Sequence, residues 1–267
     1  MNFTHLHVHT AFSLLDGASK IPSLIARVEQ LGMNSIAITD HGNMYGVLDF
    51  YKEALKQDVK PIIGCEVYLA PKSRFERKDF NGRKYFHLIL LAKNNIGYQN
   101  LTRLVSHANL EGYYYKPRID KELLRKYHDG LICLSACVSG EIPVALINDD
   151  YELASKLTDA YIDIFGRENF FLEIQDHGLK AEEKVRAGIL KLSREKNIPM
   201  VATNDSHYIN RDDSEFHDVL LCIQTTKTID SPHRLKFNSD DYYLKSPREM
   251  SKLFSELYLE KKKKMKC

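Results

Sequence analysis

Short apolar or β-branched runs alternate with longer amphipathic stretches along most of this 267-residue chain. Seven such runs predict strands, at residues 3–9, 35–39, 62–69, 86–92, 131–135, 170–174 and 200–203. The stretches between them predict helices, at residues 21–31, 47–57, 98–109, 151–165 and 182–196. This alternation is typical of a parallel α/β arrangement. Seven strands suit a barrel close to the (β/α)8 type better than an open doubly wound sheet.

Several other classes of protein are disfavoured by what the chain lacks. No glycine-rich phosphate turn follows the first expected strand, which argues against a dinucleotide-binding fold. No apolar run approaches the roughly 20 residues needed to cross a bilayer. The first ten residues, MNFTHLHVHT, lack the basic start and apolar stretch of a signal peptide. We therefore expect a soluble, cytoplasmic chain without a membrane partner.

The charge of the chain is unevenly distributed. The formal net charge is +2, but residues 261–266 hold five lysines, and the remainder of the chain is net acidic. A DNA-coating protein that is basic all over is therefore excluded, and any nucleic-acid contact must be local. We expect one domain over residues 1–256, followed by a disordered, lysine-rich tail over residues 257–267.

Three segments interrupt the strand and helix alternation. Residues 72–84, KSRFERKDFNGRK, form a polar, basic insertion between two expected strands. Residues 111–118, EGYYYKPR, place three tyrosines beside two cations. Residues 225–250 lose the clear pattern, and residues 251–260 predict another helix. The chain contains no internal repeat.

The segment HLHVH places histidines at positions 5, 7 and 9. Side chains two residues apart on a strand point to the same face, so His5, His7 and His9 should project together. Three crowded imidazoles are costly as bystanders, whereas metal ligation stabilises their neutral forms. The alternative is a polar strand at a sheet edge with no ligand role.

Other candidate ligands follow, or lie near the ends of, further expected strands. They are Asp40, His41, Glu66, His87, Cys137, Asp205 and His207, with Asp16 in the first loop. In a parallel barrel the loops after the strands gather at one face, where the active sites of such folds lie. The sequence therefore predicts that these side chains converge on one pocket.

Some of these assignments have a competing interpretation. Asp16 could be a turn or cap residue, and Asp40 could orient His41 instead of binding metal. Cys133 competes with Cys137 as the thiolate ligand, and we favour Cys137. The five cysteines are odd in number and scattered, which does not fit a disulfide framework. We expect five histidines to be surface or core residues without a ligand role: His107, His128, His177, His217 and His233.

The donor types in the expected pocket indicate its chemistry. Imidazole, carboxylate and one thiolate suit Zn2+ or Mn2+, with Fe2+ or Mg2+ as alternatives. Eight or nine ligands are too many for one tetrahedral ion and indicate two or three divalent ions. Such clusters activate a water molecule and clamp a phosphoryl group. The chain has no nucleophile elbow or Walker-type loop, so the residues alone favour phosphoester hydrolysis.

Six motifs occur in order along the chain: HLHVHTAFSLLDG, ITDHGNMYG, IGCEVY, HLILLAKN, LICLSACVSGEIP and ATNDSHY. Together they resemble the PHP (polymerase and histidinol phosphatase) family. The segments GYYYKPRID and KFNSDDYYLKSPREM are similar, more narrowly, to the PHP domains at the N-terminus of bacterial replicative DNA polymerases. The resemblance covers about residues 1–256, and residues 225–256 would lead toward a polymerase palm that this chain lacks.

The resemblance implies a distorted (β/α)7 TIM-like barrel with a trinuclear metal site at the C-terminal ends of the strands. The family's ligand positions fall on His7, His9, Asp16, His41, Glu66, His87, Cys137, Asp205 and His207. His41, Glu66 and Asp205 would take part in catalysis. His5 and Asp40 would support neighbouring ligands without binding metal.

The resemblance also implies a function in DNA replication. Relatives with intact sites are associated with metal-dependent 3′–5′ exonuclease (proofreading) or phosphoesterase activity. The substrate would be a single-stranded DNA 3′ end, contacted by Arg74, Arg77, Lys78, Arg83, Tyr114, Lys116 and Arg118. The other partners would be the remainder of the polymerase and the replisome subunits. Two alternatives are a non-catalytic, metal-stabilised module of the polymerase and, less favoured, a free-standing small-molecule phosphatase.

Overall fold

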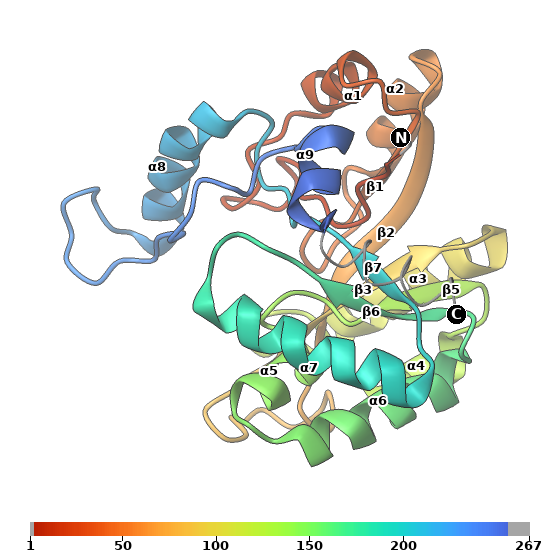
Figure 1. Ribbon diagram of the computed structural model, residues 1–267. Helices are drawn as coiled ribbons and strands as arrows, with labels where there is room; N and C mark the ends of the chain where they lie inside the picture. Colours follow the sequence, from red (N-terminus) through yellow and green to blue (C-terminus); the bar gives the residue numbers. More distant parts are fainter. Residues whose placement is uncertain (1–2, 256–267) are drawn as a thin grey trace.

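The computed structural model describes residues 3–255 and contains one curled sheet flanked by helices (Figure 1). The strands are β1 Ser35–Ile38, β2 Lys60–Leu69, β3 Phe86–Ala92, β4 Arg118–Ile119, β5 Leu131–Leu134, β6 Phe170–Ile174 and β7 Met200–Ala202. Six of them pair in the order β1-β2-β3-β5-β6-β7, and the short β4 pairs with β2 outside this path. The architecture is the expected α/β fold with a distorted, TIM-like barrel.

The helices fill most of the connections between strands. They are α1 Ile21–Gln30, α2 Val47–Lys56, α3 Asn95–Leu110, α4 Lys121–Tyr127, α5 Glu141–Ile147, α6 Tyr151–Phe165, α7 Lys180–Lys196, α8 Ser214–Thr225 and α9 Pro247–Leu253. Local capping sets several helix starts, because Asn94, Asp120 and Asp150 each accept a hydrogen bond from the backbone three residues on. Among the described residues, none of these helices is long and apolar enough to cross a membrane.

Residues 3–9, expected as the first strand, do not form a continuous strand. His5 bridges Ile36 in β1, and Val8 bridges Ser206 in the chain that follows β7. The Val8 N–H donates to the Thr39 side-chain hydroxyl at 2.8 Å, so a side chain replaces a backbone partner and interrupts the ladder. The segment nevertheless joins the two edges of the curled sheet, and thereby takes the seventh position of the barrel.

β3 runs antiparallel to both β2 and β5, whereas the alternation pattern predicts parallel strands throughout. The chain between β2 and β3 is a loop without a helix, which lets it fold straight back. This reversal brings the beginning of β3 to the edge where the parallel strands end. His87, the second residue of β3, pairs with Tyr68 near the end of β2 and so reaches the expected site.

Apolar side chains inside the barrel form a floor below this edge. Alternate residues of β3 face the interior, among them Ile89 and Leu91, which pack with Ala37, Leu134 and Ala136. The opposite face of the sheet packs against the outer helices in a larger apolar cluster. The barrel interior is therefore filled with apolar side chains, and the polar residues lie at the edge where the parallel strands end.

The C-terminal part of the described chain differs from expectation in two helices: α8 was not predicted, and the start of α9 was placed too late. The last helix begins at Pro247, four residues earlier than residue 251, because the Ser246 hydroxyl accepts the Glu249 N–H and Glu249 bonds back. The expected end of this helix at residue 260 and the lysine-rich tail lie outside the described residues. Helix α8 lies at one side of the molecule, next to the long loop that precedes α9 (Figure 1), and buries His217 and Leu221.

Candidate metal centre

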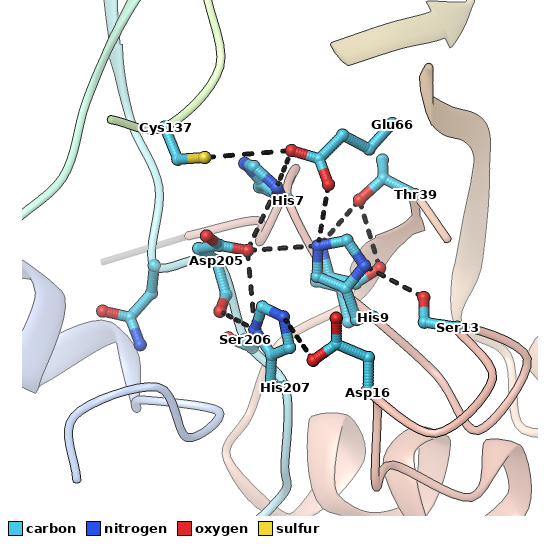
Figure 2. A network of polar contacts seen from close by, with 12 residues as sticks. His7, His9, Ser13, Asp16, Thr39, Glu66, Cys137, Asp205, Ser206 and His207 are labelled. Atoms are coloured by element: carbon cyan, nitrogen blue, oxygen red, sulfur yellow. Dashed lines mark hydrogen bonds and ion pairs between the residues drawn. The ribbon is translucent and has the colours of Figure 1, made fainter. Parts of the chain in front are cut away.

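Glu66 lies where β2 approaches its end and contacts four imidazoles, of which Figure 2 labels those of His7 and His9. Its Oε1 is 3.3 Å from His7 Nε2 and 2.8 Å from His87 Nδ1. Its Oε2 is 2.5 Å from His41 Nδ1 and 3.5 Å from His9 Nε2. The residue is fully buried, so one carboxylate serves four imidazoles in a place without bulk water.

Asp205 contacts the same cluster from the opposite side (Figure 2). Its Oδ1 is 3.1 Å from both His7 Nε2 and His9 Nε2, and 3.6 Å from His207 Nδ1. The backbone of Asp205 has a φ of 45°, in the left-handed region that non-glycine residues rarely adopt. Strained residues of this kind are concentrated at functional sites, where the surrounding structure holds them.

Asp16 closes the outer end of the cluster. Its Oδ2 is 3.2 Å from His41 Nε2, and its Oδ1 is 3.8 Å from His207 Nε2. The side chains of His41 and Asp16 keep 13% and 21% exposure, whereas His7 and His9 are fully buried. The cluster is therefore accessible to a ligand at the end formed by His41 and Asp16.

The donor atoms fall into three overlapping groups, each compact enough to hold one ion. The groups are His7, His9 and Glu66; His41, Glu66 and His87; and His9, His41 and His207. Asp205 adjoins the first group, Cys137 the second and Asp16 the third. All nine residues predicted from the sequence are thus brought together, in sets whose size and donor types suit zinc or a similar divalent ion.

Unpaired buried atoms support the fit of metal ions to these residues. Atoms that lack a hydrogen-bond partner include His7 Nε2, His9 Nε2, His41 Nδ1, Asp16 Oδ1, Glu66 Oε2 and Asp205 Oδ1. Leaving such atoms buried and unsatisfied costs about 1–3 kcal/mol each. They belong to ligands from all three groups, which is the arrangement that bound cations would stabilise.

The electrostatics of the cluster keep its acids ionised. Burial alone would raise the pKa of Glu66, but the surrounding imidazoles hold it well below its usual range. Burial opposes the charged form of His41, yet Glu66 and Asp16 raise its pKa to about 10. Burial and two neighbouring imidazoles lower the pKa of His9 to about 3. Metal ligation requires ionised carboxylates and neutral imidazoles, so Glu66 and His9 are already in the required form, whereas His41 has to lose its proton to bind a cation.

Glu173 is a site residue that the sequence analysis missed. It is buried on β6, and its Oε1 accepts a 2.8 Å hydrogen bond from His7 Nδ1. This bond leaves His7 Nε2 free to face the metal cluster. The signal for it is a carboxylate inside the apolar run FFLEI, where an unpaired charge is costly.

We expect Glu173→Ala to weaken metal binding about 10- to 100-fold, because His7 loses the partner that fixes its ring and tautomer. The affinity can be measured by competition with a chromogenic zinc chelator. Glu183→Ala, which removes an exposed carboxylate from α7, is the matched control and should bind metal like the parent. Equal affinities for all three proteins would contradict this role.

Asp40 supports His9 as well as His41, the histidine that was predicted. It accepts hydrogen bonds from the Thr10 N–H and hydroxyl and from the Ser13 hydroxyl, each at 2.7 Å. Ser13 Oγ lies 3.0 Å from His9 Nδ1, so Asp40 fixes the turn that positions His9. Its contact with the neighbouring His41 is indirect, through the Ser13 hydroxyl, which also accepts the His41 N–H.

His5 does not project with His7 and His9 into the cluster. The chain bends at His7, which breaks the two-residue period expected of a strand. His5 Nε2 bonds the Lys245 carbonyl oxygen at 2.8 Å, and its ring packs edge-on against Phe3. The described contacts of His5 are therefore packing and hydrogen-bond contacts away from His7 and His9.

His217 was expected to be a bystander but lies beside the cluster. It is buried on α8, and its Nε2 is 3.7 Å from Asp16 Oδ1 without a hydrogen-bond partner. His177, by contrast, uses Nδ1 for Glu182 and Nε2 for the Asn204 carbonyl, so both ring nitrogens are already occupied. His177 is a core histidine, as expected.

The structure places the two competing thiols on different sides of the sheet. Cys137 Sγ is 3.8 Å from His87 Nδ1 and 3.9 Å from Glu66 Oε1. Cys133 instead packs in the apolar cluster under the outer helices. Burial raises the pKa of both thiols, so Cys137 depends on a bound cation to become a thiolate.

We expect Cys137→Ser to lower the metal content by about one ion per chain, since a neutral hydroxyl is a poor replacement for a thiolate. Cys133→Ser, made in the same way, should keep the parental content. Elemental analysis of the purified proteins provides the measurement. Loss of metal from the Cys133 variant alone would reverse the assignment.

The predicted DNA-contact residues divide into buried and accessible sets. Arg74 is held by Glu111 and Asp120, and Arg118 is only 1% exposed, with its guanidinium bonded to backbone carbonyls. Neither side chain is available for direct contact with DNA, because the folded loops turn both of them inward. The accessible set consists of Arg77 and Lys78, with Arg83, Tyr114 and Lys116 half-buried.

Comparison with known proteins shows which family the chain resembles. Residues 5–177 match the family described as the PHP domain. DNA polymerase III subunit alpha of Treponema pallidum is 49% identical over 255 residues, which is 95% of this chain and 22% of that protein. The subunit from Thermus aquaticus is 48% identical over 96% of this chain and 21% of its own length. The chain thus spans about a fifth of the length of these curated relatives.

A solved structure supports the fold independently of sequence. The crystal structure of a candidate metal-dependent phosphoesterase from Bifidobacterium adolescentis superposes with a TM-score of 0.50 and covers 96% of both chains. The two sequences are only 10% identical, so the likeness concerns the fold alone.

Proposed function

This chain belongs to the PHP domain family, and from that premise we propose that it is a multinuclear metal-dependent phosphoesterase that removes nucleotides from DNA 3′ ends. The observation that carries the proposal is the complete set of nine donor residues, with unpaired buried atoms in all three groups. The identity to DNA polymerase III alpha subunits supports a role in DNA replication in the cytoplasm, beside the remaining polymerase and replisome parts.

The ligand set supports two or three divalent ions, with Zn2+ or Mn2+ as the best match. When bound, such ions would polarise a phosphoryl group and supply a hydroxide nucleophile at neutral pH. Glu66 and Asp205, which each contact several imidazoles, would hold neighbouring ions together. His41 and Asp16 would form the face toward the substrate, since they keep partial exposure.

The second candidate is a structural module whose metal ions stabilise the polymerase without turnover. Complete burial of His7, His9 and Glu66 favours it, because most of the cluster is closed to a substrate. The exposure of His41 and Asp16 favours the enzyme. The two candidates predict the same metal content, so an activity measurement has to separate them.

We expect the zinc- or manganese-loaded chain to shorten 5′-labelled single-stranded DNA stepwise from its 3′ end. His41→Ala should lower this rate at least about a hundredfold, because His41 belongs to two donor groups and faces the opening. The products can be resolved on a sequencing gel. His128→Ala, at the end of α4 and outside all three groups, is the matched control.

An intact strand with the parent protein, while that protein still holds two or three ions, would contradict the exonuclease and support the structural module. Equal shortening by the parent and His41→Ala would place any nuclease activity outside this site.

A further inference from the structure

A cleft of about 220 Å³ opens beside His41 and Asp16, at the accessible end of the metal centre. Its other lining residues include four tyrosines and a cation, Tyr45, Tyr68, Tyr113, Tyr115 and Lys116. Sites that enclose drug-sized ligands measure roughly 300–1,000 Å³. This cleft is smaller than that range, so it suits a single flat group instead of a duplex.

The tyrosines around the cleft are unusually exposed for large aromatic side chains. Tyr45, Tyr113 and Tyr115 keep 64%, 57% and 60% of their surface accessible. Exposed aromatic rings gathered at one opening indicate a binding surface. Tyr114, between two of them, instead bonds Asp79 and lies against Arg118, so it points away from the opening.

Arg118 joins the loop of residues 111–118 to the basic loop of residues 72–84. Its guanidinium donates to four carbonyl oxygens at 2.9–3.1 Å, those of Arg74, Glu76, Lys84 and Gly112. No described carboxylate pairs with this buried cation, so its bonds serve the backbone of the two loops.

This connection brings a cation of the basic loop against a tyrosine of the other loop. Lys84 Nζ lies 3.6 Å from the centre of the Tyr115 ring. Lys116 Nζ lies 5.5 Å from the centre of the Tyr68 ring, and both residues line the cleft. Tyrosine rings with adjacent cations are the combination that binds single-stranded nucleic acid without sequence preference.

We propose that the cleft holds the base of the unpaired 3′-terminal nucleotide of a single DNA strand, stacked on Tyr113 and Tyr115. Arg118 is the positioning residue that keeps these tyrosines at the cleft. This inference rests on the proposed function and adds the part of the strand that is recognised. It places the terminal base next to the metal centre, since His41 and Asp16 border the same cleft.

Binding is measured with the metal-loaded full chain and a 5′-fluorescein-labelled single strand whose last phosphodiesters are nuclease-resistant phosphorothioates. Tyr113→Ala and Tyr115→Ala should each weaken binding about tenfold, as expected when a stacking ring is removed. Tyr51→Ala, which removes a similarly exposed ring from α2, should leave the affinity unchanged. A strand with an abasic 3′-terminal residue should bind the parent about as weakly as the tyrosine variants bind the intact strand.

Arg118→Lys tests the positioning role, because lysine keeps the charge but cannot reach four carbonyls at once. It should raise the KM for the strand about tenfold and leave turnover of bis(p-nitrophenyl) phosphate, a small substrate, unchanged. Retained small-substrate turnover also establishes that this variant is folded and metal-loaded.

The outcomes separate this inference from the proposed function. Unchanged strand binding in Tyr113→Ala and Tyr115→Ala, or equal binding of the abasic and intact strands, would overturn the inference. In that case metal-dependent turnover of the small phosphodiester by the parent would still support the phosphoesterase. Absence of that turnover would overturn the proposed function itself.

Discussion

Glu66→Gln is expected to lower phosphodiester turnover at least about a thousandfold, the largest single effect in this molecule. Glu66 is fully buried and contacts His7, His9, His41 and His87. The amide keeps the shape of the side chain but loses its charge and one acceptor oxygen, and its NH2 group competes with cations for imidazole nitrogens. Two of the three donor groups lose a ligand at once.

Glu141→Gln is the matched control for this substitution. Glu141 is also a buried glutamate, but it pairs with Tyr161 and Lys121 under the outer helices. Its variant should lose some stability and keep the parental metal content and turnover. Initial rates with bis(p-nitrophenyl) phosphate and elemental analysis provide both readouts. Turnover of Glu66→Gln within tenfold of the parent would contradict the central position given to Glu66.

Removal of metal is expected to lower the melting temperature by about 10 °C. A ligand present at a thousand times its dissociation constant stabilises the folded state by about 4 kcal/mol. For a domain of this size each kcal/mol corresponds to roughly 2–4 °C. The structure explains this destabilisation. Without bound cations, three carboxylates are left close together in a mostly buried space: those of Asp16, Glu66 and Asp205.

Thermal unfolding of the parent, before and after dialysis against a chelator, measures this effect, and added zinc should restore the original melting temperature. Glu66→Gln should respond much less to the chelator, since its metal affinity is already reduced. An identical melting temperature for the metal-loaded and metal-free parent would show that the ions contribute nothing to folding.

Most strands of the barrel could be predicted from the sequence, because the residue pattern of a strand depends only on its own short segment. It did not reveal the reversal of β3, since an apolar run looks the same in either direction. The basic, glycine-containing connection between β2 and β3, which lacks a helical pattern, is only a weak signal of the reversal. The interruption of residues 3–9 also escaped prediction, because a side chain, Thr39 Oγ1, replaces a backbone partner there.

The site was predictable to the extent that most of the candidate ligands lie in a recognisable strand or just after one. Glu173 could have been found from its place in an apolar run, whereas His217 could not. The proximity of His217 to Asp16 depends on how α8 packs, which no local pattern encodes. Arg118 was misassigned to DNA contact for a similar reason, because four carbonyls from two loops converge on it only in the folded chain.

The most direct test of the account is a crystal structure of the zinc- or manganese-loaded chain, with anomalous diffraction recorded at the metal edge. We predict two or three anomalous peaks within the three donor groups that share His9, His41 and Glu66. A single ion, or ions bound only at other residues, would contradict the proposed multinuclear centre.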